Sequence, residues 1–327
     1  MERDGLGLME EVIFWRSRVI LTGAELDVFT RLDGAPATAS ALAAAMGSDA
    51  RATERLLDAL TGIGLLKKQE GVFTLSDRGR YLSSRHPETV LPMILHDNDL
   101  WRSWSRLTEV VLTGRPATDG EGKRGGADRR AFIGAMHAIG RPLSQQIARD
   151  FDARRFSRLL DIGGGSGTYT IAFLRQNPQM TAVLFDLAPV IPMAEERLAA
   201  EGVADRVTLA TGDFYRDELP SGCDLALLSA IIHQNSRDQN LDLYRKVFRA
   251  LSPGGSILIR DHVMDESRTS PPQGALFAIN MLLLTTGGDT YTFGEIKEGL
   301  ERAGFTRVTW VRSGHEMDGL VEAGKPA

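Results

Sequence analysis

The residues best suited to chemistry begin with a glycine-rich run, RLLDIGGGSGTYT, at residues 158–170. An apolar segment in this run ends in Asp161, and Gly163, Gly165 and Gly167 follow before a helical pattern begins. Glycines at such a place let the chain turn sharply and let a ligand approach the backbone. The start of the next helix adds free N–H groups and a partial positive charge. The run therefore predicts a cofactor site, because an ordinary tight turn does not need so many glycines.

The spacing of these glycines separates two classes of cofactor. A dinucleotide site needs the pattern G-x-G-x-x-G, with a helix N-terminus under the pyrophosphate. Gly163 and Gly165 fit that pattern, but the third position is Thr168. The observed spacing is G-x-G-x-G, with an acid two residues before the first glycine. This spacing disfavours a nicotinamide oxidoreductase without excluding it.

Three further features follow in order along the chain. The next apolar run ends in Asp186 (AVLFDL), whose carboxylate suits a ribose diol through two charge-assisted hydrogen bonds. The third run is followed by Gly212-Asp213-Phe214, and the fourth leads through Ser229 to His233. One aspartate at the end of a strand is often a turn residue, but the four features in order support each other.

The motif D-x-G-x-G-x-G at 161–167, together with these features, resembles the signature of class I methyltransferases that use S-adenosylmethionine. From about residue 8 to residue 322, the chain resembles the plant-type small-molecule O-methyltransferases and their bacterial relatives. The resemblance implies cofactor contacts from Asp161, Gly163, Gly165, Gly167, Asp186, Leu187, Asp213, Phe214 and Ser229. In this family the acid at Asp213 contacts the adenine amino group, and the apolar residue at Phe214 packs on the ring.

His233 occupies the position of the family's catalytic histidine, and we predict that it is a general base. Methyl transfer from a sulfonium is an in-line displacement that needs a better nucleophile than a neutral hydroxyl. A phenol has a pKa of about 10, so an imidazole with an ordinary pKa of about 6.5 can take its proton as the methyl group arrives. Such a residue must lie at the carboxyl edge of the sheet. The alternative interpretation is a histidine whose hydrogen bonds are satisfied at a strand end.

A histidine base needs a partner on its other ring nitrogen. Asp261, at the end of SILIRD, lies where the family has an acid for this purpose. The family commonly has Asp-Trp after the histidine, whereas this chain has Gln234 and Asn235. A second family acid corresponds to Thr290, so that partner is missing or is displaced to Asp289.

The acceptor pocket should be built from helices that face the cofactor, and Met and aromatic side chains suit a flat aromatic acceptor. The candidates are Trp101, Trp104, Met136, His137, Phe277, Asn280, Met281 and Leu284. Each of them has the alternative interpretation of an ordinary core residue. Phe14 and Trp15 could reach the pocket of a neighbouring subunit, as the family's intertwined dimers imply.

The N-terminal part of the chain is predicted to be mainly helical. Residues 8–32 predict one long helix whose apolar positions suggest an oligomer interface. Residues 36–85 predict helix, turn, helix and hairpin, a winged-helix arrangement with caps at Thr38 or Ser40 and at Asp49 and a stop at Gly47. Residues 36–86 hold seven Lys/Arg against five Asp/Glu, a poor phosphate-binding surface. We therefore expect dimerisation rather than DNA binding here.

The rest of the chain contains the elements that must position the predicted cofactor and catalytic residues. Residues 87–150 predict helices interrupted by an exposed, mobile loop at 118–130, and from residue 156 short apolar runs alternate with helical segments. Such alternation indicates βαβ units, and with the resemblance it implies an α/β Rossmann-like domain with a mostly parallel seven-stranded sheet. We divide the chain into a dimerisation domain (1–90), connecting helices (91–150) and a cofactor-binding domain (151–327).

Composition excludes several classes of protein. The chain has 327 residues, a net charge of −5 and 43% apolar residues, which argues against disorder and a nucleic-acid partner. Its single cysteine, Cys223, excludes an intrachain disulfide framework and any Cys-rich metal site, and we expect a cytoplasmic location. No apolar run approaches the ~20 residues needed to span a bilayer, and the N-terminus lacks a signal-peptide pattern. We expect no metal site, because the spacing of the histidines is not that of metal ligands.

The sequence thus predicts an S-adenosylmethionine-dependent O-methyltransferase, with S-adenosylhomocysteine as its product. The predicted acceptor is a hydroxyl group of a small aromatic metabolite, and the predicted assembly is a homodimer through the N-terminal domain, with no nucleic-acid or membrane partner. Alternatives are N- or C-methylation, and a bound cofactor used in a non-methylating hydroxylation, decarboxylation or pericyclic reaction. A winged-helix DNA-binding regulator is a further alternative.

Overall fold

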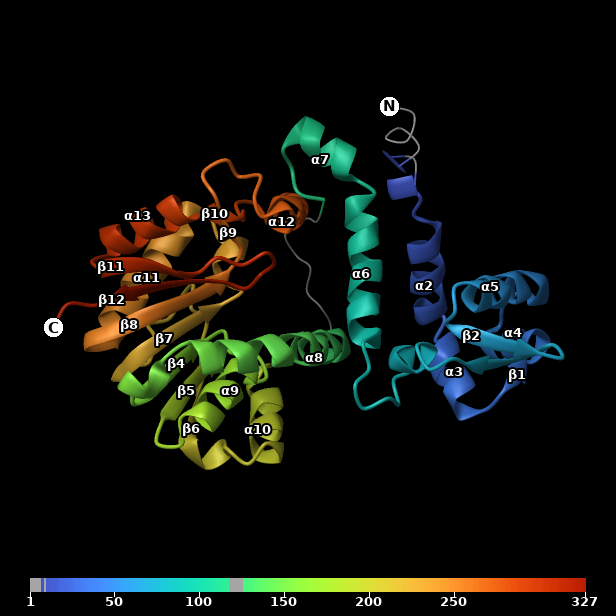
Figure 1. Cartoon of the computed structure of the whole chain (residues 1–327), viewed down its shortest axis with the longest axis horizontal. Helices are drawn as coiled ribbons and strands as arrows, with labels where there is room; N and C mark the ends of the chain where they lie inside the picture. The colour runs from blue at the N-terminus through green and yellow to red at the C-terminus, as the bar shows by residue number, and fades with distance from the viewer. Residues whose placement is uncertain (1–6, 9, 118–125) are drawn as a thin grey trace. The chain divides into compact units, whose positions relative to one another are not determined.

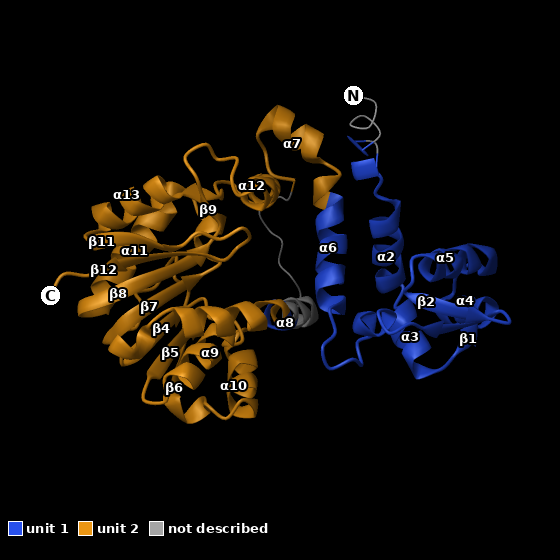
Figure 2. Ribbon diagram, in the orientation of Figure 1, with its two compact units in different colours: residues 1–102, 134–138 blue, residues 103–133, 139–327 orange. Residues whose placement is uncertain are grey.

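The computed structural model describes residues 7–8, 10–117 and 126–327, and the chain divides into two compact units (Figures 1 and 2). Unit 1 comprises residues 1–102 and 134–138, and unit 2 comprises residues 103–133 and 139–327. Most of the loop predicted at 118–130 lies outside the described residues. Its last five residues belong instead to a helix that begins at Gly126, since the alanine and arginines there favour helix.

Unit 1 holds the predicted winged-helix arrangement. Its elements in chain order are α2 (Trp15–Glu25), α3 (Val28–Gly34), β1 (Ala37–Thr38), α4 (Ala39–Met46), α5 (Ala50–Gly62), β2 (Leu66–Gln69), β3 (Val72–Leu75), the 3-10 helix η1 (Gly79–Leu82) and most of α6 (Leu91–Trp104). The three strands form an antiparallel sheet in the order β1-β3-β2. Phe29, Leu57, Leu60 and Phe73 are fully buried in its core.

The prediction of one helix over residues 8–32 was wrong. The helix α2 ends at Glu25, and α3 begins at Val28. Asp27 between them has a φ of 55°, in the left-handed region that a short polar side chain tolerates. The break lets Val28, Phe29 and Leu32 enter the core of unit 1, which a continuation of α2 would aim elsewhere.

The predicted caps and the predicted end of the winged-helix helices are present in the structure. The Thr38 hydroxyl accepts a hydrogen bond from the Ala41 N–H at 3.3 Å, and the Asp49 carboxylate accepts one from the Ala52 N–H at 2.8 Å. Gly47 ends α4 with a φ of 66°. These contacts set the length and direction of α4 and α5.

Unit 2 contains the predicted mostly parallel seven-stranded sheet, in the order β11-β12-β8-β7-β4-β5-β6. The strands are β4 (Arg158–Ile162), β5 (Thr181–Asp186), β6 (Val207–Thr211), β7 (Cys223–Ser229), β8 (Leu251–Asp261), β11 (Thr306–Arg312) and β12 (Gly319–Gly324). The five strands β6, β5, β4, β7 and β8 are parallel, and β12 and β11 are antiparallel to their neighbours. The carboxyl ends of β4, β5 and β7 therefore meet at one edge, where ligands bind in sheets of this kind.

Helices cover both faces of this sheet (Figure 1). They are α8 (Gly126–Asp150), α9 (Thr168–Gln176) and α10 (Ile191–Ala200) on one face and α11 (Arg237–Ala250) and α13 (Phe293–Ala303) on the other. The helices α7 (Leu107–Thr113) and α12 (Pro272–Leu284) form a separate small cluster. Unit 2 also contains the 3-10 turns η2 (Ala153–Arg155), η3 (Ala204–Arg206) and η4 (Ile232–Gln234). A short parallel pair joins β9 (Val263–Met264) to β10 (Tyr291–Thr292).

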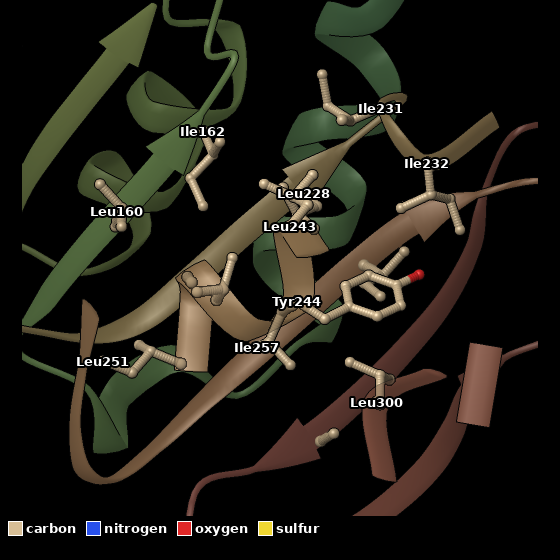
Figure 3. Close-up of a cluster of buried hydrophobic side chains, with 14 of the residues drawn as sticks. Leu160, Ile162, Leu228, Ile231, Ile232, Leu243, Tyr244, Leu251, Ile257 and Leu300 are labelled. Atoms are coloured by element: carbon tan, nitrogen blue, oxygen red, sulfur yellow. The ribbon is translucent and has the colours of Figure 1, made fainter. Parts of the chain in front are cut away.

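Each face of the sheet has its own apolar core. In one core, Leu228 and Ile257 of the sheet pack with Leu243 and Tyr244 of α11 and with Leu300 of α13 (Figure 3). The other core joins the sheet to α8, α9 and α10. Burial on both faces explains the continuous apolar runs of these strands. Among the described residues, no helix has the length and apolarity required to cross a membrane.

Candidate active site

The glycine-rich loop between β4 and α9 is held in a conformation that requires glycine. Gly163, Gly165 and Gly167 have φ values of 68°, 57° and 81°, all in the left-handed region. A Cβ at Gly163 would lie 2.7 Å from the Cδ1 of Ile231, so a side chain there would require the Ile231 side chain to shift as well as a strained φ. A Cβ at Gly165 would meet no atom within 4 Å. The loop thus presents bare backbone to open space at Gly165, as the binding of a cofactor requires.

Asp186, at the end of β5, is tied to this loop. Its Oδ2 accepts a hydrogen bond from the Gly165 N–H at 2.8 Å, and its Oδ1 accepts one from the Leu187 N–H at 2.7 Å. Burial raises the pKa of Asp186, although both backbone hydrogen bonds oppose the shift. Each carboxylate oxygen keeps a further lone pair, so Asp186 can both hold the loop and accept hydrogen bonds from a ribose.

Asp161 lies inside the structure. It is 2% exposed, and its Oδ2 accepts a hydrogen bond from the Thr170 hydroxyl at 2.6 Å. Burial raises the pKa of Asp161 to about 6, although this hydrogen bond opposes the shift. The contact joins β4 to α9 on either side of the glycine loop. Asp161 therefore shapes the loop, and its direct contact with a cofactor stays a prediction.

The segment after β6 lies beside the same loop. The Asp213 Oδ1 accepts a hydrogen bond from the Tyr215 N–H at 2.9 Å, which fixes its carboxylate at the start of a turn. A Cβ at Gly163 would lie 3.7 Å from the Cε1 of Phe214, so this aromatic ring borders the loop. Leu187, after β5, is 47% exposed and can contact a ligand. The predicted adenosine-binding residues thus gather around the carboxyl ends of β4, β5 and β6.

The fourth strand leads to a histidine bound to an aspartate. The Nδ1 of His233, in η4, lies 2.9 Å and 3.0 Å from the Oδ1 and Oδ2 of Asp261, the last residue of β8. The side chains are 12% and 1% exposed, respectively. Burial acts to raise the pKa of Asp261, but the neighbouring His233 and Arg260 outweigh it and lower that pKa below its ordinary value. Asp261 thus stays ionised and fixes the ring, and Nε2 is the ring nitrogen that can accept a proton.

A second loop holds the main chain of His233. The Asp289 N–H donates a hydrogen bond to the His233 carbonyl at 2.9 Å. A Cβ at Gly288 would lie 2.5 Å from that carbonyl oxygen, and a Cβ at Gly287 would lie 2.9 Å from the Cβ of Ser236. The role of these glycines was not predicted from the sequence. The adjacent Gly-Gly after a helix was the available signal, but the strand-end turn that approaches it is distant in sequence.

The residues that depart from the family pattern have other partners. Asn235 is fully buried, and its Nδ2 donates to the Asn240 Oδ1 at 2.9 Å. The Oδ2 of Asp289 pairs with the Arg268 Nη1 at 3.1 Å, and Thr290 is buried. The alternative in which Asp289 replaces the second acid therefore has no support in this geometry, and Asp261 is the acid that contacts His233 in the described part of the chain.

Some predicted acceptor residues lie near this pair. The ring centroid of Phe277, on α12, lies 5.0 Å from that of His233 in an edge-to-face arrangement. The Nε1 of Trp104 donates a hydrogen bond to the Asn280 Oδ1 at 3.0 Å. Leu284 packs in the same small cluster as Trp104, and Met281 is buried.

Three other predicted acceptor residues, Trp101, Met136 and His137, belong to unit 1. There, Trp101 contacts Phe14 with ring centroids 5.5 Å apart.

Comparison with known proteins identifies the family. Residues 104–306 match the model of the O-methyltransferase domain, and residues 11–85 match that of the O-methyltransferase dimerisation domain. The chain belongs to the O-methyltransferase family. Its members are S-adenosylmethionine-dependent methyltransferases, so this chain is an enzyme of that class. The predicted fold class is confirmed with it.

Individual relatives cover most of the chain. The tetracenomycin polyketide synthesis 8-O-methyl transferase TcmO of Streptomyces glaucescens is 34% identical over 90% of this chain and 89% of its own. The 3-hydroxy-5-methyl-1-naphthoate 3-O-methyltransferase of Streptomyces sahachiroi is 31% identical over 91% and 88%. The crystal structure of the N,N-8-amino-8-demethyl-D-riboflavin dimethyltransferase RosA of Streptomyces davawensis has a TM-score of 0.81 at 29% identity, over 98% and 99%.

The described residues fit this cofactor and show no metal cluster. Bare backbone at Gly165, the Asp186 carboxylate and the Asp213 turn present the groups that an adenosine with a ribose diol requires. Among the residues that the structure describes, no group of three His, Cys, Asp or Glu side chains could hold a metal ion.

Proposed function

We propose that this O-methyltransferase methylates a hydroxyl group of a small aromatic metabolite, with His233 as the general base. The observation that carries the proposal is the contact of the His233 Nδ1 with the Asp261 carboxylate at 2.9 Å. It leaves Nε2 as the proton acceptor beside the loop that would hold the cofactor. Two relatives are named for a polyketide pathway and for a hydroxynaphthoate, which supports an aromatic acceptor.

The roles of the residues follow from their positions. Gly163, Gly165, Asp186 and Asp213 would hold the adenosine part of S-adenosylmethionine, which supplies an electrophilic methyl group when bound. The Nε2 of His233 takes the proton of the acceptor hydroxyl, and the Asp261 charge stabilises the imidazolium that results. Holding the acceptor in line contributes a large part of the acceleration, so the base need not be strong.

The acceptor side of the site is proposed from α6 and α12. Phe277 contacts the His233 ring, and the hydrogen bond from Trp104 to Asn280 fixes two polar side chains of these helices. Aromatic and sulfur-containing side chains favour a flat acceptor. We also keep Trp101, Met136, His137, Met281 and Leu284 as proposed pocket residues.

Assembly and location extend the proposal. We propose a homodimer through the N-terminal domain at residues 1–90, with the connecting helices at 91–150 and the cofactor-binding domain at 151–327. Exposed Val12 and Trp15 lie within the matched dimerisation model and support this assembly. A cytoplasmic location is proposed from the single cysteine of the sequence.

An amine acceptor is the second candidate function. RosA, named as an N,N-dimethyltransferase of an aminoriboflavin, aligns over almost the whole chain. An aromatic amine needs its proton removed after attack rather than before it, so the requirement for His233 would be weaker. The acceptor panel should therefore include matched phenols and anilines.

The test is transfer of labelled methyl from S-adenosylmethionine to phenols, catechols, hydroxylated polyketides and anilines, with wild type and His233→Ala. We expect label on a phenolic oxygen and a loss of ~100-fold or more in the variant. His315→Ala, which removes an exposed histidine, is the matched control and should retain activity. Transfer that survives His233→Ala would disprove the general base, and label on nitrogen alone would favour the second candidate.

A further inference from the structure

Arg260 is a buried cation that makes no direct ion pair with a carboxylate in the described part of the chain. It is 7% exposed and precedes Asp261 at the carboxyl end of β8. Its Nη1 donates a hydrogen bond to the Tyr169 hydroxyl at 3.1 Å, and its guanidinium carbon lies 5.2 Å from the centroid of the Tyr169 ring. Its Nε is buried and has no hydrogen-bond partner among the described residues. A buried charge with an unmet donor is costly unless a ligand satisfies it.

The neighbours of Arg260 belong to the cofactor side of the sheet. Successive residues of a strand point to opposite faces, so Arg260 faces away from the Asp261 carboxylate that binds His233. Arg260 is in register with Ser229 at the end of β7. Tyr169, two residues after Gly167, has its hydroxyl close enough to Ser229 to interact with it. Three polar side chains thus meet beside the glycine loop, on the face opposite the proposed base.

The order of strands indicates which part of the cofactor reaches them. The proposed adenosine contacts, Asp186 and Asp213, follow β5 and β6, on one side of the glycine strand β4. The strands β7 and β8 lie on its other side. A cofactor with its adenosine over β5 and β6 and its sulfur near His233 extends its amino-acid end toward β7 and β8. That end carries a carboxylate, the group that a guanidinium binds best.

We propose that Arg260, positioned by Tyr169 and assisted by Ser229, binds the carboxylate of the methionine portion of the cofactor. The inference rests on the proposed function and assigns a subsite within it. Arg260 then anchors the far end of the cofactor, and its charge adds to the effect of His233 in lowering the pKa of the adjacent Asp261.

The test is calorimetric binding of two product analogues to the full-length protein. One probe is S-adenosylhomocysteine, and the other is its decarboxylated analogue, 5′-deoxy-5′-(3-aminopropylthio)adenosine, which keeps the amino group. Arg260→Met should weaken S-adenosylhomocysteine by about 10-fold or more, as expected for loss of a charge-assisted hydrogen bond, and should leave the analogue within about twofold. Wild type should prefer S-adenosylhomocysteine, and the variant should not.

Controls separate this role from a structural one. Arg154→Met removes an arginine side chain that is 84% exposed and should change neither affinity. Tyr169→Phe keeps the ring and removes the hydroxyl, so a smaller loss confined to S-adenosylhomocysteine is expected even where Arg260→Met folds poorly. Equal weakening of both probes, or unchanged affinity for S-adenosylhomocysteine, would overturn the proposal. Wild type that binds neither probe would instead overturn the proposed function as a whole.

Discussion

The Nδ1 of His233 lies within hydrogen-bond distance of both carboxylate oxygens of Asp261, at 2.9 Å and 3.0 Å. The two residues are 28 positions apart in the sequence. Asp261 ends β8, and His233 lies in η4, shortly after the neighbouring parallel strand β7 ends at Ser229. The pairing fixes the ring orientation, selects Nε2 as the proton acceptor and places a fixed negative charge behind the imidazolium.

Asp261→Asn should preserve the shape of this contact and remove its charge. We expect kcat for a phenolic acceptor to fall by roughly 10-fold or more, since the variant loses part of the about 10²- to 10⁴-fold contribution of a general base. The affinity for S-adenosylhomocysteine should stay unchanged. Steady-state kinetics and calorimetry measure the two quantities. Unchanged kcat in a folded variant would show that His233 needs no orienting charge.

The burial of Asp161 should make stability depend on pH. Its folded pKa of about 6 lies above the ordinary 3.8. The stabilisation that follows is complete below about pH 3.8 and is lost as pH rises through 6, because the folded state must then hold a buried charge. A shift of about two pKa units corresponds to about 3 kcal/mol. Asp161→Asn does not titrate, so its Tm relative to wild type should rise between pH 4.5 and 7.5.

Asp205→Asn provides the control for this pH series. Asp205 is exposed in the turn η3, and the Tm difference of this variant from wild type should be flat with pH. Parallel Tm curves for wild type and Asp161→Asn would contradict the raised pKa. Thermal scans at constant ionic strength measure both.

The sequence predicts the elements whose signals are local. The apolar runs that end in Asp161, Asp186 and Asp261 form strands β4, β5 and β8 because burial on both faces demands continuous apolar residues. The glycine loop could also be predicted from the sequence, since the positive φ values at Gly163 and Gly165 favour glycine.

Features that depend on distant contacts could not be predicted. The six residues of β12, GLVEAG, include two glycines and a glutamate, and they form a strand because they fill the space between β8 and β11. The break at Asp27 is decided by packing of α3 in the core of unit 1. Alternation along a strand gives the face of Arg260, but only the fold brings Tyr169 to it. The helix and strand propensities of the residues predict none of these contacts.

Gly288→Ala should damage the site through the backbone of His233. The new Cβ would lie 2.5 Å from the His233 carbonyl oxygen and 2.6 Å from the Thr285 hydroxyl, so the turn must shift. We expect kcat to fall by at least about 10-fold, because small displacements of a catalytic group are costly. Gly62→Ala, at the end of α5 with no atom within 4 Å of its new Cβ, is the matched control and should retain full activity. Equal kcat values in the two variants would show that the contact between Gly288 and the His233 carbonyl does not matter for catalysis.

Trp104→Phe should affect the acceptor and not the cofactor. The variant leaves the Asn280 Oδ1 without the donor that lies 3.0 Å away. Loss of one hydrogen bond is worth about 1 kcal/mol, so KM for the acceptor should rise about fivefold while cofactor affinity stays constant. Trp310→Phe is the control, because the Trp310 Nε1 is buried without a partner among the described residues. A rise in KM for both substrates would place Trp104 outside the acceptor pocket.

Trp15→Glu should separate the proposed dimer. Val12, Ile13, Phe14 and Trp15 are 74%, 54%, 53% and 71% exposed, an apolar N-terminal segment that the described chain leaves uncovered. Exposed apolar patches of this kind mark interaction surfaces, and the segment lies within the matched dimerisation model at 11–85. A charge at Trp15 must be desolvated if a second copy covers it, which weakens association.

Analytical ultracentrifugation over a range of protein concentrations measures this outcome. Wild type should sediment as a dimer and Trp15→Glu as a monomer at the same concentration. Val311→Glu places the same charge at a 42%-exposed apolar position on β11, outside that model, and should stay dimeric. A dimeric Trp15→Glu would move the interface elsewhere. If the monomer also loses methyl transfer while it still binds S-adenosylhomocysteine, then the partner copy contributes to the acceptor side of the site, as expected if Phe14 or Trp15 enters its pocket.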